Sequence, residues 1–134
     1  CFIHCRRDPL DTCISCFKRP ISKAYRRDMK SIGKYYRNYS DLMAHWKNVL
    51  PVEIFDLNYE DLVSSPEHHI RKLIDHVGVE WDDACLRPHD MQRAVNTPSR
   101  NQVSKPINKD AIGSWRQYES HAGPLIEALG DLVK

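Results

Sequence analysis

The feature that most constrains the fold is a short apolar segment that leads almost directly into the start of a helix. The first five residues, CFIHC, have the composition of a β-strand, and Asp8-Pro9 follows them after two arginines. Aspartate before proline is typical of a helix N-cap and first helical position, and Pro20 ends the predicted helix. The amino end therefore predicts a strand followed by a short helix.

The rest of the sequence extends this alternation of strands and helices. A second helix is predicted from about Ser31 to Leu50, where Pro51 ends it, and a second strand from Val52 to Tyr59. A third helix is capped by Ser65-Pro66 and closed by Gly78. Residues 81–108 are polar and contain three prolines, which predicts a long loop with at most one short helix before a helical end. This order predicts an α/β fold with a partial parallel sheet and mostly helices.

Apolar residues at helical spacing give each predicted helix a buried face. The faces are Leu10, Cys13, Ile14 and Phe17 in the first helix; Ile32, Tyr35, Tyr39, Leu42, Trp46 and Val49 in the second; Ile70, Leu73, Ile74 and Val77 in the third; and Ile112, Trp115, Leu125, Ile126, Leu129, Leu132 and Val133 at the end. We interpret the aromatic stripe of the second helix as core rather than as a ligand cage.

Composition excludes several classes of protein. With 134 residues and 41% hydrophobic content, the chain is predicted to form one domain, 1–134. A formal net charge of +2 without a basic block argues against nucleic-acid binding, and no apolar stretch has the length of a membrane span. The five cysteines are predicted to be reduced. Cys13 and Cys16 form a C-x-x-C without a second pair, so no metal site is predicted.

One stripe of the first helix carries groups that suit an anion. Asp11, Ser15 and Arg19 recur at every fourth residue, away from the apolar face, and Arg7 lies at the carboxyl end of the strand. Two guanidinium groups and a hydroxyl are suitable hydrogen-bond donors for a phosphate monoester. The alternative is a surface arginine that pairs with Asp8 or Asp11, beside a solvent-exposed serine. Spacing alone leaves both interpretations open.

Three ordered motifs resemble one enzyme family. The segment FIHCRRDPLDTCISCFKR resembles the 3′-phosphate-binding segment of sulfotransferases that use 3′-phosphoadenosine 5′-phosphosulfate (PAPS). LMAHWKNVLP followed by YEDLVSSPE is similar to a helix, strand and turn of the same enzymes. SRNQVSKPINKDAIGSWRQYE resembles the nucleotide-covering segment of bacterial tetratricopeptide-linked sulfotransferases and, more distantly, of tyrosylprotein sulfotransferases.

The resemblance implies a nucleotide site and assigns residues to it. It makes Arg7 and Ser15 the 3′-phosphate pair, Arg19 a second cation, Tyr59 a neighbour of the adenine, and Ser99, Gln102 and Lys105 parts of the covering segment. Relatives carry a basic residue where this chain has Ser114, so one nucleotide contact is expected to be absent. In the alternative interpretation Tyr59 belongs to the core, and Gln102 and Lys105 are solvated loop residues. Trp115 is expected to pack rather than to stack on a ligand.

The resemblance also implies a P-loop-NTPase-like sulfotransferase fold, of which this chain is the carboxyl-terminal half. None of the five glycines belongs to the glycine- and lysine-rich loop that holds the phosphosulfate, so that loop and the catalytic base are expected before Cys1. The isolated chain is expected to be inactive. The implied partners are PAPS, a hydroxyl or amine acceptor, and the missing half or a second copy. The implied location is the bacterial cytoplasm, or the Golgi lumen for the tyrosylprotein branch. A non-catalytic nucleotide-binding or interaction module is the alternative function.

Overall fold

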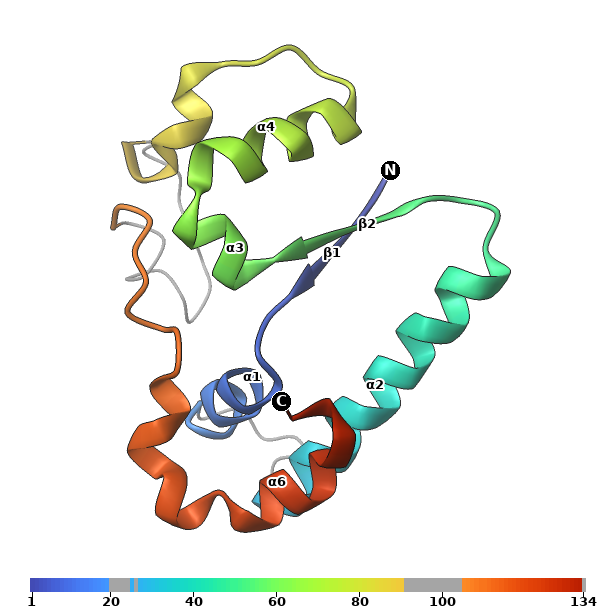
Figure 1. Cartoon of the computed structure of the whole chain (residues 1–134), viewed down its shortest axis with the longest axis vertical. Helices are drawn as coiled ribbons and strands as arrows, with labels where there is room; N and C mark the ends of the chain where they lie inside the picture. The colour runs from blue at the N-terminus through green and yellow to red at the C-terminus, as the bar shows by residue number, and fades with distance from the viewer. Residues whose placement is uncertain (20–24, 26, 91–104, 134) are drawn as a thin grey trace. The chain divides into compact units, whose positions relative to one another are not determined.

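The computed structural model describes residues 1–19, 25, 27–90 and 105–133 of the chain (Figure 1). These residues form two compact units. The first, here called the sheet unit, consists of Cys1–Arg6 and Ile54–Asp110. The second, the helical unit, consists of Arg7–Glu53 and Ala111–Lys134.

The sheet unit is built on two parallel strands. Strand β1 spans Phe2–Arg6 and strand β2 spans Ile54–Asn58. Their register pairs Phe2 with Ile54 and continues to Arg6 with Asn58. Helices α1 and α2 lie between the two strands in the sequence, as the helical crossover of a parallel pair requires. The predicted parallel sheet is confirmed, and β2 is shorter than the predicted strand at both ends.

Short helices complete the sheet unit. They are α3 (Tyr59–Ser64), α4 (Pro66–Val77) and the 3₁₀-helices η2 (Asp83–Leu86) and η3 (Pro88–Asp90). Helix α4 packs on β2, and Leu57, Val63 and Ile70 are buried. Gly78 ends α4 in a left-handed conformation (φ 78°) as predicted, and its N–H donates to the Ile74 carbonyl at 3.0 Å. Val77 was predicted to be buried but is 40% exposed, because it lies in the last turn of α4.

The helical unit holds the larger core. Its helices are α1 (Pro9–Phe17), α2 (Met29–Val49), η4 (Ser114–His121), α6 (Gly123–Leu129) and η5 (Gly130–Leu132). The core cluster consists of Leu10, Cys13, Ile14, Ile32, Leu125 and Leu129. Residues from the two ends of the sequence therefore form one core, which confirms Leu10, Cys13 and Ile14 of the first predicted face and Leu125 and Leu129 of the last. Ile112 and Ile126, also predicted to be buried, are 39% and 37% exposed.

Helices α2 and α6 approach closely at Gly33. Figure 1 shows α6 beside the first turns of α2. A β-carbon added at Gly33 would lie 2.8 Å from Ala128 Cβ and 3.1 Å from Leu125 Cδ1. Because both distances are shorter than ordinary carbon contacts, this crossing needs a residue without a side chain.

The interpretation of the α2 stripe as core is wrong for most of its length. Tyr35 is 52% exposed, Leu42 44%, Trp46 42% and Val49 55%. For Leu42, Trp46 and Val49 the physical reason is length: α2 has 21 residues and α6 has 7, so α6 covers only the first turns. Tyr35 lies in those first turns, and its ring stacks on that of Tyr25, with centroids 4.0 Å apart. Phe17, predicted as core, is also 37% exposed, because it is the last residue of α1.

Candidate functional site

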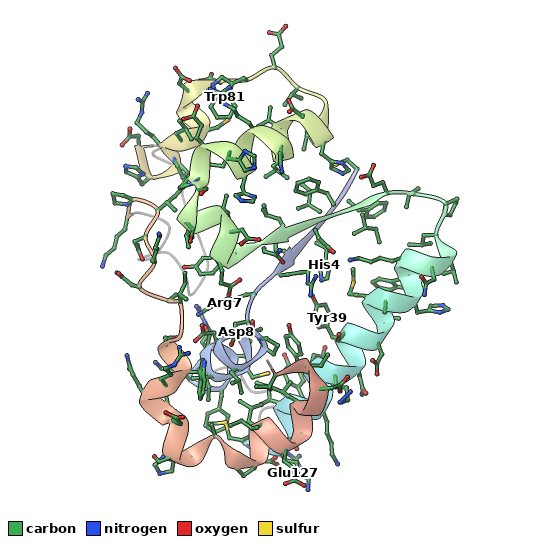
Figure 2. The ribbon with its side chains drawn as sticks, viewed as in Figure 1. His4, Arg7, Asp8, Tyr39, Trp81 and Glu127 are labelled. Carbon is green, nitrogen blue, oxygen red and sulfur yellow. The ribbon has the colours of Figure 1, made fainter. Side chains whose placement is uncertain are left out.

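The predicted phosphate-binding segment begins where the chain enters α1. Figure 2 labels Arg7 and Asp8 at this point. Asp8 is the N-cap of α1, and its side chain accepts the backbone N–H of Asp11 at 2.8 Å. Pro9 occupies the first helical position, where its missing N–H leaves no hydrogen bond unmade. The Asp-Pro motif therefore fixes the position of Arg7 directly before the helix.

Arg7 is a half-buried cation with protein contacts on its guanidinium. Its side chain is 22% exposed, and Nη2 lies 3.7 Å from Oδ2 of Asp11. The same nitrogen donates to the backbone carbonyl of Ala111. The backbone carbonyl of Arg7 accepts the hydroxyl of Tyr36 at 3.3 Å. Arg7 thus has the partner expected from the alternative interpretation, Asp11, but it is not a surface residue.

Asp11 is the most connected side chain of this region. Its carboxylate is completely buried and accepts the N–H of Gly113 at 2.7 Å, the hydroxyl of Ser114 at 3.0 Å and the N–H of Trp115 at 2.8 Å. We call Arg7, Asp11, Gly113, Ser114 and Trp115 the Asp11 network. Three hydrogen bonds and a nearby cation satisfy this buried charge, as burial of a carboxylate requires.

Sequence reasoning missed the role of Asp11. It placed Asp11 on an outward stripe with Ser15 and Arg19, whereas the structure buries Asp11 against a segment about a hundred residues later. The hydroxyl of Ser114 donates to Asp11. Gly113 has a φ of 67°, a left-handed conformation that favours glycine. Asp11 and Gly113 were each visible in the sequence, but no local pattern connects them.

The other predicted site residues lie in different units. Ser15 is partly buried on α1, and Arg19, also partly buried, follows that helix. Tyr59 is the first residue of α3 and is partly buried, and Lys105 is exposed; both belong to the sheet unit. Ser99 and Gln102 lie outside the described residues. Trp115 packs against the core of the helical unit, which confirms the expectation for that residue.

A histidine–carboxylate pair lies on the sheet. His4 and Asp56 are register partners, and His4 Nδ1 lies 2.8 Å from Asp56 Oδ1. Figure 2 labels His4 on β1. Arg6 Nη1 is 3.7 Å from the other oxygen of Asp56. Sequence reasoning did not find this pair, although the parallel register would have placed the two residues opposite each other.

The C-x-x-C of α1 does not provide two reactive thiols. Burial raises the pKa of the Cys13 thiol to about 12, with smaller contributions from Cys16 and Asp8. Cys13 therefore stays protonated near neutral pH, while Cys16 is exposed. Within the described ranges, no three histidine, cysteine, aspartate or glutamate side chains are grouped as metal ligands. No described helix combines the length and apolar character that crossing a membrane requires.

Comparison with known proteins gives a family for the chain. Residues 1–83 match the profile described as the sulfotransferase family. An uncharacterised protein of Aquifex aeolicus (strain VF5) is 31% identical over 137 residues, which is 98% of this chain and 18% of that protein. Chicken protein-tyrosine sulfotransferase 2 is 24% identical over 118 residues, covering 69% of this chain and 32% of the relative.

A third relative is named for a different acceptor. The omega-hydroxy-beta-dihydromenaquinone-9 sulfotransferase of Mycobacterium tuberculosis (strain CDC 1551 / Oshkosh) is 28% identical over 105 residues, or 77% of this chain and 26% of the relative. The chain thus spans less than a third of the length of each of these relatives. The profile match covers more than half of the chain and includes β1, α1, α2, β2 and α4. The chain therefore belongs to the sulfotransferase family.

Proposed function

We propose that this chain supplies the 3′-phosphate- and adenosine-binding part of a sulfotransferase that takes PAPS as its donor. The observation that carries the proposal is the position of Arg7, a half-buried cation held directly before the N-terminus of α1. A cation next to a helix N-terminus favours an anion for two electrostatic reasons, the guanidinium charge and the helix dipole.

The residues of this region fit a phosphate monoester. A guanidinium carries five N–H donors in a planar fork whose geometry matches the oxygens of a phosphate. In the proposal, Arg7 and the hydroxyl of Ser15 bind the 3′-phosphate. Arg19 adds a second positive charge at the other end of the same helix. Because these groups come from one short helix and its flanks, their spacing does not depend on loop conformation.

The remaining assignments follow from the resemblance and the family match. Tyr59 is proposed to contact the adenine from the start of α3, and Lys105 to contact the nucleotide from the segment that covers it. Ser99 and Gln102, which lie outside the described residues, complete the proposed set. Stacking on an aromatic ring suits adenine because every base has a π face.

The proposed reaction transfers the sulfuryl group of PAPS to an acceptor hydroxyl or amine. Catalysis of this kind rests on positioning, charge neutralisation and a general base. The residues of this chain bind a phosphate away from the reacting sulfur, so they contribute orientation of the donor. A P-loop-like fold with a glycine- and lysine-rich phosphosulfate loop is part of the proposal.

The names of two relatives point to the acceptor class. One names protein tyrosine and the other an omega-hydroxy menaquinone derivative, and both acceptors carry a hydroxyl group. We therefore favour a hydroxyl over an amine. A bacterial cytoplasmic location is kept as a proposal, with the Golgi lumen as the alternative for a tyrosylprotein-type enzyme.

Titration calorimetry with adenosine 3′,5′-bisphosphate tests the proposal. Arg7→Ala is expected to weaken binding by about 1.5–3 kcal/mol, roughly 10- to 150-fold, because a charge-assisted hydrogen bond is lost. Adenosine 5′-monophosphate, which lacks the 3′-phosphate, is expected to bind equally weakly to both proteins. Circular dichroism checks that the Arg7→Ala protein is folded at the temperature of the titration.

Arg6→Ala is the matched control. Arg6 is the adjacent arginine, with its side chain 55% exposed and paired with Asp56 at 3.7 Å. Its removal changes the net charge by the same amount but is expected to leave nucleotide affinity within about twofold, since exposed charges are screened. Equal affinities for the wild-type and Arg7→Ala proteins would remove Arg7 from the site.

A further inference from the structure

Residues 111–115 are held at two points by residues of the α1 entry. The guanidinium of Arg7 donates to the carbonyl of Ala111. The carboxylate of Asp11 accepts the N–H groups of Gly113 and Trp115 at 2.7 and 2.8 Å. All of these residues belong to the helical unit. The cation and the anion therefore bind the same five-residue segment, which we call the anchor segment.

Asp11 has no route to a ligand. Its side chain is 0% exposed, and its negative charge would repel a phosphate. Among the described ion pairs, Arg7 is the cation beside Asp11, with Nη2 3.7 Å from Oδ2, and it can therefore link this carboxylate to an anion. Any role of Asp11 in phosphate binding is therefore one of positioning, not of contact.

Ala111 and Asp11 both act on Nη2 of Arg7. Ala111 holds Nη2 through a neutral carbonyl, and Asp11 attracts the same nitrogen electrostatically. Asp11 also fixes where the Ala111 carbonyl lies, because it binds Gly113 and Trp115 next to it in the chain. Removing the carboxylate would free the anchor segment and, with it, the carbonyl that orients the guanidinium.

The effect must also run in the opposite direction. If the order of the anchor segment favours the phosphate-binding orientation of Arg7, then phosphate bound to Arg7 favours the ordered segment by the same free energy. A phosphate that shares Arg7 with Asp11 would hold the guanidinium in one orientation and thereby the carbonyl of Ala111. Phosphate binding at the start of α1 would then increase the order of the anchor segment, about a hundred residues later in the chain.

We infer that Asp11 is a positioning residue that couples phosphate binding at Arg7 to the order of the anchor segment, residues 111–115. The inference rests on the proposed function, since it takes Arg7 as the phosphate ligand. It adds a residue that the resemblance does not assign. The coupling can be measured at Arg7, as nucleotide affinity, or in the anchor segment, as amide exchange.

A double-mutant cycle tests the coupling, with adenosine 3′,5′-bisphosphate as the probe. Asp11→Asn is expected to weaken binding about 2- to 30-fold in the wild-type background, the range for residues that act through a network. In the Arg7→Ala background the same change is expected to alter affinity less than twofold. Glu67→Gln, which also removes one carboxylate from an arginine pair, is the matched control and is expected to leave affinity unchanged.

Hydrogen exchange gives a readout that a purely structural role would not move. Saturating adenosine 3′,5′-bisphosphate is expected to slow exchange of the Gly113 and Trp115 amides in the wild-type protein and not in Asp11→Asn. If Asp11→Asn does not fold, Ser114→Ala replaces it, because it removes only the hydroxyl donor at 3.0 Å. Ser114→Ala is then expected to weaken binding at least twofold, and only when Arg7 is present.

The outcomes separate this inference from the proposed function. If the wild-type protein binds the nucleotide through Arg7 but the Asp11 and Arg7 effects add independently, the coupling is wrong and the proposed function stands. Unchanged protection of Gly113 and Trp115 on binding leads to the same conclusion. If the wild-type protein does not bind the nucleotide, both the proposed function and the inference are wrong.

Discussion

Two arginine–carboxylate pairs in this chain have the same sequence spacing and opposite environments. Arg7 and Asp11 are four residues apart, with Nη2 3.7 Å from Oδ2, and their side chains are 22% and 0% exposed. Glu67 and Arg71 are also four apart, 2.8 Å at the closest atoms, and 59% and 47% exposed. Two guanidinium nitrogens of Arg71 donate to Glu67, at 3.0 and 2.8 Å. By distance alone, the Glu67–Arg71 pair would be the stronger interaction.

Burial reverses this ranking. An exposed pair four residues apart on a helix contributes a few tenths of a kcal/mol, because water and salt screen it. A buried carboxylate interacts strongly with each group around it and is costly to leave unpaired. Arg7 also precedes the N-cap Asp8, so the Arg7–Asp11 pair is not a helix-surface pair at all. Equal spacing in the sequence therefore says little about what a pair does.

Asp11→Ala is expected to have the largest effect on stability. The change leaves the N–H groups of Gly113 and Trp115 and the charge of Arg7 without a carboxylate that is completely buried. Breaking a buried charged network costs about 3–5 kcal/mol in unfolding free energy. Urea denaturation followed by circular dichroism measures the difference from the wild-type protein.

Glu67→Ala is the control for this measurement, because it removes the carboxylate of an exposed arginine pair whose two residues are also four apart in the sequence. If Asp11→Ala costs no more than Glu67→Ala, burial does not distinguish the two pairs and the importance assigned to the Asp11 network is wrong.

Ser114→Ala is expected to have an intermediate effect. It removes one donor to a buried carboxylate, at 3.0 Å, while the bonds from Gly113 and Trp115 remain. A single hydrogen bond to a charged group contributes about 1.5 kcal/mol at the low end of its range. The same denaturation experiment in the Asp11→Ala background should show almost no further loss. An equal loss in both backgrounds would mean that Ser114 acts independently of Asp11.

Local signals in the sequence were sufficient for the elements that begin or end at special residues. Asp8 and Pro9 start α1 and Gly78 ends α4 as predicted, because capping depends on a few neighbouring residues. The parallel pairing of β1 and β2 followed from the order of elements. The family resemblance, confirmed by the profile match, came from three motifs in sequence order.

Properties that depend on distant partners could not be predicted. The exposure of Trp46 depends on where α6 ends, which the pattern of α2 does not contain. The burial of Asp11 depends on backbone N–H groups about a hundred residues later, and every residue except proline has such a group. For the same reason, the sequence could suggest Arg7 as a phosphate ligand but not the side chain that orients it.

Glu67→Gln is expected to have the smallest effect. It removes the charge of an exposed pair while keeping the size of the side chain, so the unfolding free energy should fall by less than about 0.5 kcal/mol. Changing Glu67 rather than Arg71 leaves the guanidinium over the Trp81 ring, 3.9 Å from its centroid.

Denaturation at low salt and at about 1 M NaCl tests the screening, because the Debye length falls to about 3 Å at that concentration. The small difference caused by Glu67→Gln should disappear at high salt, whereas most of the loss caused by Asp11→Ala should remain. If high salt removes both differences equally, then water and ions reach Asp11 in solution, and the two pairs differ less than their burial indicates.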